Sequence, residues 1–182
     1  MTSYVLSQTS ETPTGMKELL VILGASFLIT LFGSVAIPLP FTPIPLATQA
    51  QVVLLLGALL GSRRAALAVG LFLIEGACGL PVFSGGKCGL AHLCGPTGGY
   101  LLGYLFGAYA TGWVVERAKE RTQLVVFGAM ALGNGVIFLC GFAYLSLFLG
   151  PVSACLLGVL PFLLGDGLKL MFATQLFKRL RA

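Results

Sequence analysis

The chain has 182 residues, of which 57% are apolar and only 9% are charged. This balance excludes an ordinary soluble domain, where about a quarter of the residues are charged, and predicts a protein embedded in lipid. The net charge of +5 does not indicate nucleic-acid binding, because the basic residues stand in short clusters between apolar blocks without interleaved aromatic side chains.

The first apolar block follows a polar stretch, residues 1–18, which we expect to be a cytoplasmic N-terminal segment. The run Leu19–Ile37 is longer than the hydrophobic region of a secretory signal, so it predicts a retained first helix. The prolines within 38–45 exclude a regular helix there, since proline removes a backbone donor and clashes with the preceding turn. A second helix is therefore expected to begin near Gln49.

Two further helices are predicted at Ala65–Leu80 and Thr97–Val115, joined by a glycine-rich loop. Glu75 lies inside the first of them. An acidic side chain near the end of a membrane helix is expected to reach an interface or pair with a cation, such as Lys87, and a direct role in ligand binding is the second interpretation. The loop itself carries apolar residues and is expected to pack on the bundle, either as a plain connection or as a lid over a ligand.

The last charge-free run, Thr122–Gly165, is too long for one crossing, and Gly150-Pro151 divides it into a fifth helix and a sixth that continues to Phe177. We therefore predict an all-α integral membrane protein with one domain, residues 19–182, of six transmembrane helices. With six spans, nine of the eleven Lys and Arg residues fall on one side. The positive-inside rule places that side, with both termini, in the cytoplasm.

Asp166 and Lys169 are the charged residues deepest in an apolar block, and their i,i+3 spacing places them on one helical face. Buried charges in membrane helices are costly, and they pair with each other or face a ligand cavity. Both readings stay open from the spacing alone. The nearby Pro161, Gly165 and Gly167 loosen the helix, which favours a polar ligand site.

Other residue combinations do not indicate catalysis or a metal. Cys88, His92 and Cys94 offer only three ligands at a spacing that matches no usual zinc pattern, and a Cys88–Cys94 disulfide is the better reading in an oxidising compartment. A single histidine gives no convincing catalytic triad. We therefore expect no enzyme activity and no cofactor.

Several short motifs occur together in one order, and their combination resembles the BioY family, the biotin-specific S components of energy-coupling-factor (ECF) transporters. The motifs are Pro40-Phe41-Thr42-Pro43-Ile44-Pro45 followed by Gln49, the loop Gly79-Leu80-Pro81-Val82-Phe83 with Gly85-Gly86, the string Gly95-Pro96-Thr97-Gly98-Gly99-Tyr100, and Pro161-Phe162 with Gly165-Asp166 and Lys169. The resemblance extends from the first helix to the sixth. It implies a multi-pass protein of a bacterial cell membrane that binds biotin outside and releases it inside.

The resemblance also implies partners, and from the chemistry of biotin we hypothesise which residues form its site. Two cytoplasmic ATPases and a transmembrane coupling protein would supply energy, docking at the first helix, where Ser26, Thr30 and Ser34 form a row of small residues. Asp166 and Lys169 would hold the ureido ring of biotin. The remaining candidates are Asn134, Gln49, Thr42 and Ser84 as polar helpers, Phe83 and Tyr100 over the apolar body, and Lys87 at the carboxylate. The alternatives are an S component for another vitamin, a stand-alone biotin transporter, an intramembrane enzyme and a non-transporting assembly subunit.

Overall fold

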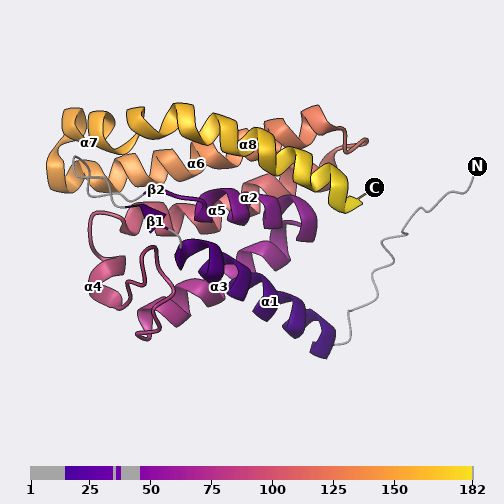
Figure 1. Ribbon diagram of the computed structural model, residues 1–182, viewed down its shortest axis with the longest axis horizontal. Coiled ribbons are helices and arrows are strands. Elements are labelled where there is room, and N and C mark those ends of the chain that lie inside the picture. Colours follow the sequence, from indigo (N-terminus) through magenta and orange to yellow (C-terminus); the bar gives the residue numbers. More distant parts are fainter. Residues whose placement is uncertain (1–14, 35, 38–45, 182) are drawn as a thin grey trace, which may run out of the picture.

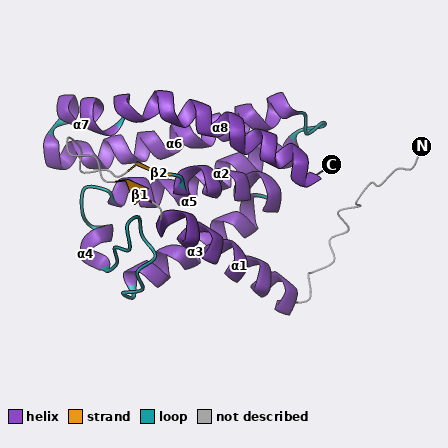
Figure 2. Ribbon diagram, viewed as in Figure 1, coloured by secondary structure: helices purple, strands orange, loops and turns teal. Residues whose placement is uncertain are grey.

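The structure is a computed structural model that describes residues 15–34, 36–37 and 46–181. This part of the chain forms eight helices and one pair of two-residue strands (Figures 1 and 2). In Figure 1, α6 and α8 run along one long side of the bundle and α1 and α3 along the other, with α2 and α5 between them. The fold is therefore all-α, as the sequence predicts.

The first helix, α1 (Gly15–Ser34), starts and ends earlier than predicted. Residues Ala36–Ile37, which we expected to be helical, form β1 and pair antiparallel with β2 (Leu46–Ala47). The two strands bracket the proline-rich segment, so the chain leaves the helix before the first proline rather than at it. The correction follows from proline, which disfavours helical conformation in the residue that precedes it.

The next helices are short, α2 (Gln49–Leu60) and α3 (Ser62–Ala77), and only Gly61 separates them. Gly61 has a φ of +87°, a conformation that favours glycine. The backbone N–H and the hydroxyl of Ser62 each donate to Glu116 of α5 at 2.7 Å. One carboxylate thus holds the tight α2–α3 turn against α5.

Close contact between α5 (Gly98–Arg117) and α6 (Gln123–Leu149) rests on a row of glycines. A Cβ at Gly99, Gly103 or Gly107 would lie against α6, for instance 2.7 Å from the carbonyl oxygen of Cys140 in the case of Gly99. Small residues at this spacing let helix backbones approach each other in a membrane protein. The short α4 (Leu90–Leu93) belongs to the loop that precedes α5.

The predicted sixth helix is broken. It consists of α7 (Pro151–Gly158) and α8 (Leu160–Arg181), with a distorted residue, Val159, between them. Pro161 explains the break, because a proline is tolerated in the first turn of a helix but not in its interior. The predicted division at Gly150-Pro151 is confirmed, since α6 ends at Leu149 and Gly150 has a φ of +76°.

Many large apolar side chains are exposed on the surface of the helix bundle, as expected for a protein surrounded by lipid. Phe27 of α1, Leu147 of α6 and Phe172 of α8 are 66%, 79% and 72% exposed. Within the described ranges, α1 and α6 are long and apolar enough to cross a membrane, and the bent α7–α8 pair is a third candidate. The protein is therefore an integral membrane protein, while the count of six spans and the side of the termini remain predictions from the sequence.

Candidate functional site

The charged pair predicted from the sequence lies on the buried face of α8. The Lys169 ammonium is 3.3 Å from Asp166 Oδ1, and Asp166 is only 7% exposed. The i,i+3 spacing therefore brings the two side chains together as expected. A carboxylate in this position keeps further lone pairs that one ammonium does not occupy.

Three side chains from other helices surround this carboxylate. The amides of Gln51 (α2) and Asn134 (α6) face Asp166, although neither makes a hydrogen bond of standard geometry with it. The Tyr104 ring of α5 is close enough to interact with the same carboxylate. The site is therefore assembled from four helices, α2, α5, α6 and α8.

The two amides have unused hydrogen-bonding capacity. Both polar atoms of Gln51 and the carbonyl oxygen of Asn134 are buried and lack a hydrogen-bond partner among the described residues. Buried polar atoms without partners are rare and costly, and such a group calls for a specific explanation. Together with the charged pair, these amides present donors and acceptors to a polar group that has both.

Gln49, two residues before Gln51, has a different environment. Its amide nitrogen donates to the carbonyls of Ile29 and Val82 at 3.2 and 3.3 Å, and its oxygen accepts from the Ser84 hydroxyl at 2.9 Å. The structure thus places Gln49 and Ser84 together, in a junction between α1, α2 and the loop after α3. Their polar groups are engaged with each other and with the backbone.

The predicted aromatic residues lie in two separate places. Phe83 is fully buried against Gly76 and Phe72 of α3, with the two phenyl rings edge to face at 5.5 Å. Tyr100 packs on Gly141 of α6, and its hydroxyl donates to the Gly158 carbonyl at 2.8 Å. Gly158 is the last residue of α7, so Tyr100 caps the end of this helix.

The loop that carries Lys87 packs on the bundle. Phe83 and Lys87 form an isolated antiparallel bridge, while the Lys87 side chain is exposed. Burial, with a smaller effect of Lys87, lowers the pKa of His92, whose ring lies 3.3 Å from the Thr97 hydroxyl.

Cys88 and Cys94 are free thiols here, and no group of three or more metal-binding side chains occurs in the part of the chain that the structure describes. Thr42 lies outside the described residues.

Glu75 and the small-residue row of α1 meet at one contact. The Ser26 hydroxyl donates to the Glu75 carboxylate at 2.7 Å, and Ser26 is fully buried. The partner of Glu75 is thus Ser26, and not Lys87 as we considered. The Thr30 hydroxyl donates to the Ser26 carbonyl at 3.2 Å, and the Ser34 side chain lies outside the described part. In this conformation Ser26 faces α3 rather than a partner protein.

Two residues of the Asp166 environment were missing from our candidates. Tyr104 is one turn after the candidate Tyr100, so the i,i+4 spacing would have placed both on one face of α5. Gln51 is the other, and the sequence alone assigned it no role in the site. Residues 49 and 51 point in different directions around a helix. The sequence alone therefore does not decide which of the two amides lies near Asp166.

The chain was compared with known families, proteins and structures. A sequence model described as the BioY family matches residues 6–182. The biotin transporter BioY of Rhizobium etli is 36% identical over 86% of this chain and 88% of its own length. The probable biotin transporter BioY of Pyrococcus horikoshii is 35% identical over 91% of this chain and 98% of its own.

A solved structure agrees with these matches. The S component for biotin from an ECF-type ABC transporter superposes with a TM-score of 0.84, at 29% identity, and covers 92% of both chains. The helices that bring Asp166, Lys169, Gln51 and Asn134 together are therefore arranged as in that protein. Since the family pattern spans nearly the whole sequence and two relatives exceed 30% identity over most of it, the chain belongs to the BioY family.

Proposed function

We propose that this chain is the biotin-binding S component of an ECF transporter and that it holds the ureido ring of biotin at Asp166. The observation that carries the proposal is the buried Asp166–Lys169 pair, which is faced by two amides with unpartnered polar atoms among the described residues. The relatives of the BioY family are named as biotin transporters, and the superposed structure is named as a biotin S component.

The chemistry of the ligand complements these groups. A cyclic urea has two N–H donors and one carbonyl acceptor. Asp166 accepts from an N–H group, and Lys169 donates to the carbonyl, as charge-assisted hydrogen bonds. Gln51 and Asn134 supply amide groups for the remaining positions. Lys87, the only Lys or Arg between residues 78 and 97, is our candidate for the carboxylate at the end of the biotin tail.

Energy for transport would come from a separate module. The sequence contains no phosphate-binding loop of the Gly-x-x-x-x-Gly-Lys-Ser/Thr type. Without a nucleotide-binding loop of its own, the chain would need an external source of energy to drive uptake against a gradient. We therefore propose that an ECF module of two ATPases and a coupling protein energises this chain, and proteoliposomes that contain the chain with and without that module would test the coupling.

A competition experiment tests the ligand assignment. Ligand-free protein in detergent is titrated with biotin by calorimetry, and desthiobiotin, thiamine and riboflavin are added as competitors. We expect saturable binding of one biotin per chain and displacement by desthiobiotin, which keeps the cyclic urea. Binding heat from thiamine or riboflavin, with no heat from biotin, would instead identify a different vitamin as the ligand.

The variant Gln51→Leu is expected to weaken biotin binding and to stabilise the ligand-free protein. Removing a buried amide without standard hydrogen bonds relieves a penalty of about 1–3 kcal/mol. Gln49→Leu is the matched control, since its amide makes three hydrogen bonds and its loss should lower stability. Thermal unfolding with and without biotin measures both effects. A lower melting temperature for Gln51→Leu would contradict the assignment of Gln51 as a ligand group.

A further inference from the structure

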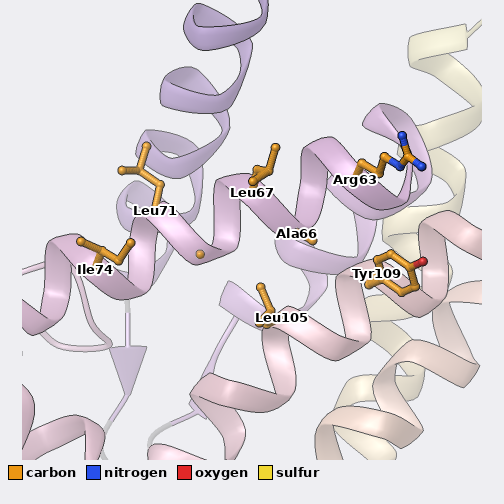
Figure 3. Close-up of a pocket in the computed structure, with 8 residues that line it drawn as sticks. Arg63, Ala66, Leu67, Leu71, Ile74, Leu105 and Tyr109 are labelled. Carbon is orange, nitrogen blue, oxygen red and sulfur yellow. The ribbon is translucent and has the colours of Figure 1, made fainter.

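An apolar groove of about 640 Å³ lies on the bundle surface between α3 and α5. Figure 3 shows Arg63 and Tyr109 at one end of this groove and Ile74 at the other, with Leu67, Leu71 and Leu105 along it. Gly70 lies in its wall, and a Cβ at this position would have Leu105 Cδ1 at 4.0 Å as its nearest neighbour. A side chain added at Gly70 would therefore extend into the groove.

The groove continues into a second, polar cavity of about 660 Å³, and Arg63 and Tyr109 line both. Four arginines, namely Arg63, Arg64, Arg117 and Arg121, line this cavity together with the acids Glu18 and Glu116. The lining therefore carries two more positive than negative charges. Glu18, which lines the cavity, lies in the first turn of α1.

Both acids of this cavity are already engaged. Glu18 pairs with Arg64 at 3.3 Å, and Glu116 accepts two hydrogen bonds from Ser62. Arg117 lies over the Trp113 ring at 4.0 Å. Arg63 and Arg121 take part in no ion pair within the described ranges. The uncompensated positive charge thus lies in the lining of the polar cavity, and one of these arginines, Arg63, also lines the groove.

The length of the groove matches one leaflet. From Arg63 to Ile74, α3 rises by about 16 Å at about 1.5 Å per residue. Half of a hydrocarbon core of about 30 Å is close to that value. A cationic cavity at the end of an apolar groove of this length has the dimensions of a lipid headgroup and its acyl chain.

We propose that this groove and cavity bind an anionic phospholipid from the leaflet on the basic side of the protein. An acyl chain lies over Gly70 between α3 and α5, and the phosphate is held by Arg63 and Arg121. An anionic headgroup gains attraction from each arginine, whereas a zwitterionic headgroup has no net charge to be attracted. None of these residues belongs to the cluster around Asp166, so the lipid site is independent of the proposed biotin site.

The test uses delipidated protein in detergent, titrated with dioleoylphosphatidylglycerol or dioleoylphosphatidylcholine and observed by native mass spectrometry. We expect the parent protein to retain one phosphatidylglycerol at least about fivefold more tightly than phosphatidylcholine, from roughly a fivefold gain per arginine. Added salt should reduce the preference, because screening weakens exposed charges. Equal retention of the two lipids by the parent protein would overturn the proposal without the need for any variant.

Two variants assign the parts of the site. The double substitution Arg63→Gln and Arg121→Gln should abolish the preference for phosphatidylglycerol. Gly70→Leu should fill the groove and reduce retention of both lipids, whereas Gly128→Leu, on α6 with nothing within 4 Å of its Cβ, is the matched control and should not. An unchanged preference for phosphatidylglycerol in the arginine variant, or undiminished retention of both lipids by Gly70→Leu, would overturn the assignment.

A protein partner on the same face would give a different pattern. If the substitutions leave lipid retention unchanged but prevent co-purification of a coupling protein, the face is a protein interface and the lipid proposal is wrong. Biotin titration of each variant checks its folding, because these positions lie outside the Asp166 cluster. Retained biotin binding together with lost lipid preference is the result that supports the proposal.

Discussion

Asp166→Asn is expected to weaken biotin binding by about tenfold to a hundredfold while the protein still folds. The substitution keeps the shape of the side chain but removes the charge that accepts from the ureido N–H groups. A hydrogen bond to a charged group contributes about 1.5–3 kcal/mol, and each 1.4 kcal/mol is a factor of ten in affinity. Calorimetric titration of the ligand-free variant measures the change.

The matched control is Glu75→Gln, which neutralises the other acid inside an apolar helix. Because an amide oxygen can still accept from Ser26, biotin affinity should stay within about twofold of the parent. Desthiobiotin should weaken by the same factor as biotin in Asp166→Asn, since both ligands carry the cyclic urea. If only biotin weakened, Asp166 would contact another part of the ligand, and an unchanged affinity would place the ring elsewhere.

Gly99→Ala is expected to destabilise the protein strongly through the α5–α6 contact. The added Cβ would overlap Tyr144 Cβ and lie 2.7 Å from the carbonyl oxygen of Cys140, so one helix must shift. Forcing extra volume into a packed interface costs typically about 1–3 kcal/mol. Thermal unfolding in detergent should show a clear fall in the melting temperature.

Gly128→Ala on α6 is the control for Gly99→Ala. Its Cβ would have no neighbour within 4 Å, so the substitution adds helix propensity without a clash. We expect an unchanged or slightly raised melting temperature. Equal melting temperatures for the two variants would show that the close approach of α5 and α6 does not depend on Gly99.

Local rules account for the parts of the fold that the sequence predicted correctly. The low content of charge predicts lipid as the solvent, and Gly150-Pro151 predicts the end of α6 because proline is disfavoured inside a helix. The i,i+3 spacing of Asp166 and Lys169 predicts their contact within α8, since residues at this spacing are neighbours on any α-helix. These features depend only on residues close in the sequence.

Local errors arose where two rules competed. The apolar run through Ile37 favoured a longer first helix, but the following proline disfavoured it, and the chain forms β1 instead. Pro161 was recognised as loosening the last helix, and the structure shows that it ends one helix and starts another. Sequence alone did not decide between a bend and a break.

Only the tertiary structure decided which amide faces Asp166, which residue pairs with Glu75, and where Phe83 packs. In a soluble helix the polar face marks the outside, whereas here the lipid-facing and the buried faces are both apolar. The pattern of α2 therefore does not fix its rotation, and Gln49 and Gln51 are equivalent until α1, α6 and α8 are placed around them. By itself the sequence determined the membrane class and the charged pair, and the packing of distant helices determined its surroundings.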